Sequence, residues 1–120
     1  MKFAAPAAST VRDFEALLPS APGVTSKMMF GQPAAVVNGH LFFGVFGNQL
    51  FVRLSDADRS EAGEIPGFLP FEPMPGRAMR EYLILPTGWR SAPSRSRPWV
   101  ARALRYASSL SPKTPKARSK

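Results

Sequence analysis

The sequence contains no cysteine and a single histidine, His40. Without cysteine the chain has no disulfide framework and no thiolate nucleophile, and zinc sites of the usual Cys/His kinds are excluded. No segment approaches the ~20 apolar residues of a transmembrane helix, and the N-terminus lacks the apolar run of a signal peptide. We therefore expect a cytoplasmic protein that binds no membrane, metal or cofactor.

Acidic residues are missing from the last third of the chain. The 120-residue sequence has a formal net charge of +8. Residues 1–81 hold seven basic and eight acidic residues, whereas residues 82–120 hold nine basic residues and no acidic one. The length fits one domain. We expect a flexible N-terminus over 1–8, a globular domain over 9–110 and a disordered basic tail over 111–120.

Two short turns in the middle of the chain predict a three-stranded antiparallel meander. Asn38-Gly39 is typical of a two-residue hairpin turn, and Gly47-Asn48 indicates a second one. Counting across turns of this length gives the strand register. The predicted pairs are Val37–His40, Val36–Leu41 and Ala34–Phe43 across the first turn, and Phe46–Gln49, Val45–Leu50, Phe43–Val52 and Leu41–Leu54 across the second.

Alternation along these strands then separates two faces of the meander. The wholly apolar face is the predicted core, with Ala34, Val36, Leu41, Phe43, Val45, Leu50, Val52 and Leu54. The other face is mixed, with Ala35, Val37, His40, Phe42, Phe46, Gln49, Phe51 and Arg53. This mixed face is either partly wet or covered by something that the sequence does not identify, such as a layer of helix or a dimer partner.

Helices are expected before and after the meander in the sequence. The first follows a hydroxyl cap at Ser9-Thr10, and the second runs from the capping box that begins at Ser55 to about Gly63. A β-rich segment over 79–85 follows. The last helix opens at Ser96-Arg97-Pro98, with the inward stripe Trp99, Val100, Ala103, Leu104, Ala107 and Leu110. The sequence therefore predicts an α+β, two-layer α-β(3)-α-β(2)-α fold on an antiparallel sheet.

The chemistry-bearing residues do not form a catalytic set. His40 follows the first turn with no carboxylate placed near it, as a catalytic triad would need. Glu61 and Glu64 flank Gly63 at a helix end, which is typical of exposed acids rather than a paired-carboxylate site. Phosphate-binding glycine loops are also missing. The sequence therefore predicts that the protein is not an enzyme.

The basic end of the chain is the candidate contact region. Such charge either keeps the protein in solution or attracts an acidic partner, which is a protein or, through weak and sequence-independent contacts, a nucleic acid. Base stacking on the aromatic residues of the mixed face is the less favoured route to nucleic acid. The sequence leaves open whether the protein is a monomer or a homodimer. The candidate contact residues are Arg102, Arg105, Lys113, Lys116, Arg118 and Lys120.

An ordered series of short segments resembles the N-terminal domain of the TfoX/Sxy family. The segments are Pro22-Gly-Val-Thr-Ser-Lys-Met-Met-Phe-Gly31, Val37-Asn-Gly39, Met74-Pro-Gly-Arg-Ala-Met79, Glu81-Tyr82, Trp99-Val-Ala-Arg-Ala-Leu104 and Ser109-Leu-Ser-Pro-Lys113. The resemblance implies the same α-β(3)-α-β(2)-α order, with a long first strand from Lys27 to Val37 bent at Gly31-Gln32-Pro33. It carries over no catalytic residue.

The best-known members of that family regulate natural competence and have a second, C-terminal domain, so the resemblance implies a stand-alone copy of the first. The leading hypothesis is a non-catalytic regulatory or adaptor module that acts by contact with an unidentified partner protein. The alternative is weak, salt-sensitive, sequence-independent binding of nucleic acid through the cationic C-terminal third.

Overall fold

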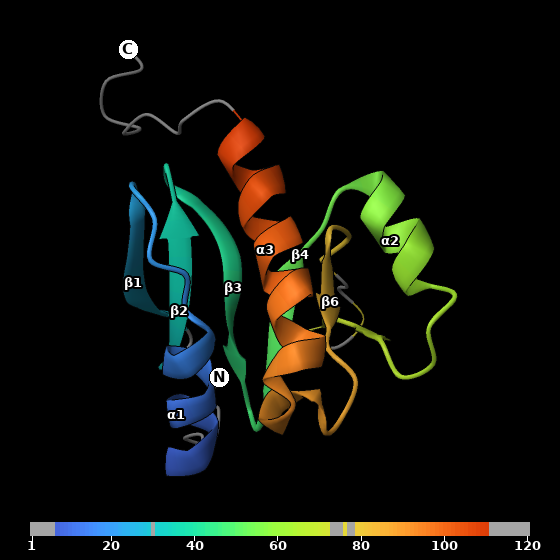
Figure 1. The fold of residues 1–120 in the computed structure, drawn as a ribbon, viewed down its shortest axis with the longest axis horizontal. Helices are drawn as coiled ribbons and strands as arrows, with labels where there is room; N and C mark the ends of the chain where they lie inside the picture. Colours follow the sequence, from blue (N-terminus) through green and yellow to red (C-terminus); the bar gives the residue numbers. More distant parts are fainter. Residues whose placement is uncertain (1–6, 30, 73–75, 77–78, 111–120) are drawn as a thin grey trace.

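A computed structural model describes residues 7–29, 31–72, 76 and 79–110 of the chain. In this part of the chain, α-helices pack on a six-stranded antiparallel sheet, which confirms the predicted α+β class (Figure 1). The elements are α1 (Ala8–Leu17), β1 (Val24–Met29), β2 (Gln32–Val37), β3 (His40–Phe46), β4 (Gln49–Arg53), α2 (Asp56–Ala62), β5 (Leu69–Pro70), β6 (Tyr82–Ile84), the 3-10 turn η1 (Trp89–Ser91) and α3 (Pro93–Ser109).

The sheet has the order β1-β2-β3-β4-β6-β5. Its first two strands form a hairpin in which Met29 lies opposite Gln32, so the expected single strand from Lys27 to Val37 is wrong. Gly31 has a φ of 76°, in the left-handed region that glycine enters without strain, and the chain reverses there instead of bending. Four strands therefore precede α2.

Both predicted turns are confirmed. Asn38 and Gly39 have φ values of 52° and 85°, the positive values that a type I′ turn requires at both positions. The register next to the turns follows the predicted count, with Val37 opposite His40 and Phe46 opposite Gln49. The pairs Val36–Leu41, Val45–Leu50 and Phe43–Val52 are also as predicted.

A β-bulge changes the register farther from the first turn. The pairing shifts between Ala35 and Val36, so that Ala35 lies opposite Phe43 and Ala34 opposite Gly44. The predicted Ala34–Phe43 pair is therefore wrong. Phe42 is the extra residue on β3, and an extra residue in one strand turns the side chains beyond it to the other face.

The core between the helices and the sheet consequently draws from both predicted faces. Phe43, Val45, Leu50, Val52 and Leu54 are buried there, as predicted. Ala35, Val37 and Phe42 join them, contrary to their placement on the mixed face. On the helix side, Phe14 of α1 stacks on Phe43 with ring centroids 4.8 Å apart. The remaining helix residues of this core are Leu17, Ala62, Trp99, Val100, Ala103 and Ala107.

The opposite face of the sheet is covered by the chain itself. Ala34 and Leu41, predicted in the main core, instead lie in a second cluster with Phe51 and Phe71. Phe71 follows β5 and is fully buried, with its ring stacked on Phe51 at 4.3 Å. Val36, also assigned to the core face, packs against this second cluster. Of the residues predicted on the mixed face, Phe51 is thus covered by Phe71, whereas the helices cover Ala35, Val37 and Phe42.

Close packing in this second cluster depends on a glycine. Gly44 pairs with Phe51 across β3 and β4, and the Phe51 ring lies directly over it. A Cβ atom at Gly44 would lie 2.6 Å from Cζ of Phe51, which is closer than carbon atoms can approach. The position therefore needs a residue without a side chain.

Only one of the two predicted hydroxyl caps forms. The Ser55 side chain accepts a hydrogen bond from the Asp58 amide at 3.2 Å, and α2 ends at Gly63, as predicted. In contrast, α1 begins at Ala8, so Ser9 and Thr10 lie inside the helix and do not cap it.

Thr10 instead helps to attach α1 to the rest of the fold. Its hydroxyl accepts a hydrogen bond from Arg90 at 2.7 Å and donates one to Asn48 at 3.0 Å. Arg90 also pairs with Asp13 at 3.0 Å. The guanidinium of Arg90, which lies in η1, thus contacts two side chains of α1.

Helix α3 begins three residues before the predicted start at Ser96. Pro93 occupies its first turn, where a missing N–H costs nothing, and Pro98 lies inside the helix. The inward stripe is confirmed for Trp99, Val100, Ala103 and Ala107, which are buried, while Leu104 is half-buried against the same core. The opposite face of α3 is open to solvent.

Candidate protein-contact surface on α1 and α3

Two of the six basic residues that the sequence singled out lie on α3. Arg102 and Arg105 are the two candidate contact residues that the structure describes, and it places them in different settings. The other four, Lys113, Lys116, Arg118 and Lys120, lie outside the described residues.

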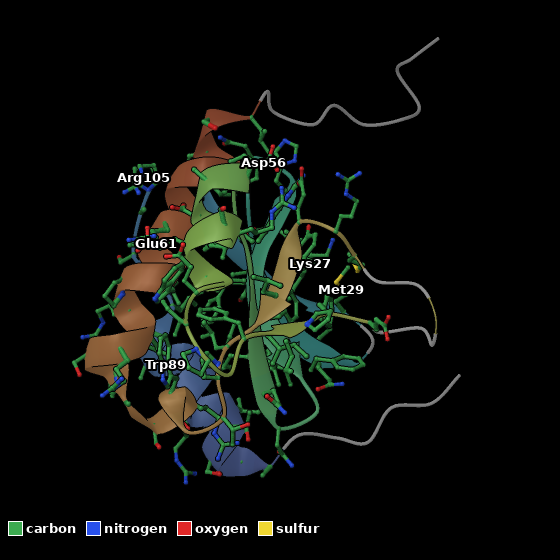
Figure 2. All side chains as sticks on the ribbon, turned by 90° about the vertical axis from the view of Figure 1, so that its right-hand side faces the viewer. Lys27, Met29, Asp56, Glu61, Trp89 and Arg105 are labelled. Atoms are coloured by element: carbon green, nitrogen blue, oxygen red, sulfur yellow. The ribbon has the colours of Figure 1, made fainter. Side chains whose placement is uncertain are left out.

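Arg102 is engaged within the fold. Its guanidinium lies over the Trp99 ring, 4.3 Å from the centroid, and donates hydrogen bonds of 3.1 Å to Asp58 and to Glu61. The hydrogen bond from Arg102 lowers the pKa of Glu61. Arg102 therefore joins α3 to α2, and its predicted role in partner contact stays a prediction. Figure 2 shows Glu61 close against α3.

Arg105 is exposed and points outward from α3, away from the sheet (Figure 2). It lies at one end of a groove of about 310 Å³ between α1 and α3, and Arg97 lies in the same lining. We call this feature the α1/α3 groove. Its other lining residues are Ala16, Leu17, Leu18, Pro19, Val100, Ala101 and Leu104, all of them apolar.

The two arginines of the groove are spaced along one helix face. Arg97 and Arg105 are eight residues apart in α3, which corresponds to about 12 Å along the axis. Ala101 lies midway and is exposed, so α3 presents a small residue between two cations. Among the described residues, neither Arg97 nor Arg105 forms an ion pair.

A second charged cluster, which the sequence did not reveal, joins α3 to the sheet. Arg53 at the end of β4 donates a hydrogen bond of 2.7 Å to Glu81, and the Tyr106 hydroxyl donates one of 3.0 Å to the same carboxylate. Burial raises the pKa of Glu81, but the two hydrogen bonds outweigh it and hold the pKa below its ordinary value. A carboxylate held ionised in this way is a poor general base.

No sequence signal places these three residues together. Arg53 lies opposite Tyr82, the neighbour of Glu81, only because β6 pairs with β4. The predicted element order did not include that pairing. A hollow beside this cluster is lined by charges of both signs, including Asp56, Arg59 and Glu81.

The remaining titratable candidates also lie apart from one another. His40 is half-buried at the start of β3 opposite Val37, and Glu64 is exposed just after α2. Within the described ranges, no three His, Cys, Asp or Glu side chains are grouped closely enough to hold a metal ion. None of the helices in those ranges combines the length and hydropathy needed to cross a bilayer.

Comparison of the sequence with models of protein families identifies the family of this chain. A family model for the TfoX N-terminal domain matches residues 16–107. The chain belongs to the TfoX N-terminal domain family. The match begins near the end of α1 and reaches the last turn of α3, so it includes all the lining residues of the α1/α3 groove of this TfoX domain. No curated protein sequence matches the chain.

Proposed function

We propose that this TfoX N-terminal domain is a non-catalytic regulatory module that acts by contact with a partner protein. Membership of the family supports a regulatory role, because the best-known members regulate natural competence. The observation that carries the proposal is the α1/α3 groove, in which an exposed apolar surface lies between Arg97 and Arg105. Surfaces that combine apolar area with arginine are typical of protein interfaces.

The use of the carboxylates supports a non-catalytic role. Each acid that is brought close to another charged side chain is held by an arginine. Asp13 is held by Arg90, Asp56 by Arg59, Asp58 and Glu61 by Arg102, and Glu81 by Arg53. Apart from the Asp56–Arg59 pair within α2, these contacts connect different elements of the fold. Ionised carboxylates of this kind contribute to structure rather than to proton transfer.

The proposal is tested by affinity capture from a native lysate, with the full-length chain as bait. We expect a small set of proteins to be retained at low salt, and one of them to bind the purified chain saturably in isothermal titration calorimetry. A heat-denatured bait is the control for non-specific adsorption. If no captured protein binds the purified chain, the module does not act by protein contact.

Nucleic-acid binding is the second candidate. It is favoured by the nine basic residues after Glu81 and by the exposure of Arg95, Arg97 and Arg105 on one helix. Stacking of bases on the sheet has no support, since Phe51 is 2% exposed and Phe42 is fully buried. Any binding would therefore rest on phosphate contacts and fall steeply with salt.

Titration of duplex DNA and of RNA at two salt concentrations separates the two candidates. A chain that ends at Leu110 is the comparison, and it keeps all of α3, which ends at Ser109. Binding that weakens with salt and is lost in the shorter chain supports this second candidate. An absence of binding by the full chain at low salt excludes it.

A further inference from the structure

We propose that the α1/α3 groove binds an acidic amphipathic helical segment of the partner protein. This inference rests on the proposed function and names the chemistry of the partner. In such a segment, apolar side chains enter the groove between Leu18 and Leu104, and carboxylates on the same helix meet Arg97 and Arg105.

The floor of the groove sets the apolar part of the ligand. Leu17, Leu18 and Pro19 line it from the end of α1, and Val100 and Leu104 line it from α3. Its volume of about 310 Å³ is at the lower limit for small-molecule sites, and the lining has no polar side chain apart from the two arginines. Such a groove lacks the hydrogen-bonding groups that orient a cofactor, but it fits one or two large aliphatic side chains.

The arginines set the charged part of the ligand. Arg97 and Arg105 are about 12 Å apart along α3, which is slightly more than two helical turns. A second helix lying along α3 would offer carboxylates at a matching distance if they were seven or eight residues apart. The apolar residues of that segment would then fall between the two carboxylates, over the small exposed side chain of Ala101.

Charge disfavours the other occupants of the groove. A second copy of this chain carries a net charge of +8 and would bring further cations to Arg97 and Arg105. Residues 111–120 of the same chain contain four basic residues and no acidic one. Nucleic acid would meet the two arginines but would leave the apolar floor without a complementary surface.

The probes are two fluorescein-labelled helical peptides of about 16 residues, long enough to span the groove with one turn to spare at each end. Both carry leucines at the central i, i+3, i+4 positions. The first has glutamates seven or eight residues apart on the same face, and the second has glutamines at those positions. Their binding to the full-length chain is measured by fluorescence anisotropy at low salt.

Three variants of the chain locate the binding site. Arg105→Glu reverses a charge of the groove, and Arg80→Glu makes the same change at an exposed residue outside the groove lining. Ala101→Gln places a larger neutral side chain in the groove. The fold should be preserved, because position 101 is exposed and glutamine has a high helix propensity. Circular dichroism checks that all three remain folded.

The expected result is saturable binding of the acidic peptide and weaker binding of the glutamine peptide. Arg105→Glu should lower the affinity for the acidic peptide about fivefold or more, because an attraction becomes a repulsion. Arg80→Glu should change that affinity less than about twofold. Ala101→Gln should lower the affinity for both peptides about tenfold, since the larger side chain blocks the apolar contacts.

Several results would overturn the inference. Equal affinity for the two peptides would remove the role of charge, and equal weakening by Arg80→Glu and Arg105→Glu would indicate non-specific attraction. A change in self-association caused by Ala101→Gln would assign the groove to a second copy, and competition by duplex DNA for the peptide would assign it to nucleic acid. If a captured protein binds Ala101→Gln as well as it binds the unmodified chain, the proposed function stands and this groove assignment fails.

Discussion

Replacement of Arg102 by alanine should destabilise the domain, although Arg102 and Arg105 are both basic residues of one helix. Arg102 stacks on Trp99, which is worth about 0.5–1 kcal/mol. Its pair with Asp58 joins side chains that are only 27% and 19% exposed, and such a pair contributes up to about 1 kcal/mol. Water screens the further contact with Glu61. The free energy of unfolding should therefore fall by about 0.5–2 kcal/mol.

Arg105→Ala is the matched control, because Arg105 is exposed and has no ion pair within the described part of the chain. Its effect should remain within about 0.5 kcal/mol. Urea unfolding followed by circular dichroism measures both variants. With an m-value of about 2 kcal/mol/M, the midpoint of Arg102→Ala should fall by about 0.25–1 M.

A double-mutant cycle tests the contact itself. Asp58→Ala combined with Arg102→Ala should cost less than the two single changes added together, since each removes the same ion pair. Additive effects would show that the pair does not stabilise the fold. Equal midpoints for the alanine variants at Arg102 and Arg105 would refute the assignment of Arg102 as a structural residue.

Three further predictions concern the second core and the carboxylates. Gly44→Ala should destabilise the domain by about 1–3 kcal/mol in urea unfolding, because its Cβ would clash with Phe51, whereas Gly63→Ala, which meets only ordinary contacts, should be nearly neutral. Phe71→Ala should cost about 3 kcal/mol or more and increase dye binding to exposed apolar surface, unless the cover over Phe51 contributes nothing to stability. Since the folded-state pKa of Glu81 lies below the value of about 4.3 for an unfolded chain, its contribution is complete above that pH and is lost as the pH falls further. Urea midpoints measured in acid should thus decline less steeply for Glu81→Gln than for the unmodified chain, and parallel declines would contradict this reasoning.

The features of the fold that could be predicted are those encoded by adjacent residues. Asn38-Gly39 determines its turn because both residues adopt positive φ values, and Ser55 caps α2 through an atom three residues away. The inward stripe of α3 follows from the spacing of its apolar residues. Each of these features depends on local geometry that the sequence specifies directly.

The assignment of sheet faces could not be predicted, because the residues around the β-bulge are apolar on both faces of the sheet. A one-residue bulge near Phe42 exchanges the faces of Ala34 and Ala35, and neither arrangement exposes an obvious polar mismatch that would reveal the error. Where one face of a strand is polar, the same register shift would place polar residues in the core, and the alternation of polar and apolar residues would reveal it. Here only the position of Phe71 shows which residues face away from the helices.

The charged residues were harder to assign, because their roles depend on which elements become neighbours. Arg102 was identified as a contact residue from its place on α3, but the acids of α2 reach it only in the folded chain. Arg105 is on the same helix and remains exposed. Helical position distinguishes inward from outward residues, but it does not indicate whether an outward residue meets another element.

The attachment of α1 also affects where this domain can be separated from a longer sequence. The family match begins at residue 16, after Phe14 and Asp13. A chain trimmed to that boundary would lose the ring that stacks on Phe43 and the carboxylate that holds Arg90. We therefore expect the smallest stable fragment to start before the region by which the family is recognised, so fusion or excision should begin before Ala8, where α1 starts.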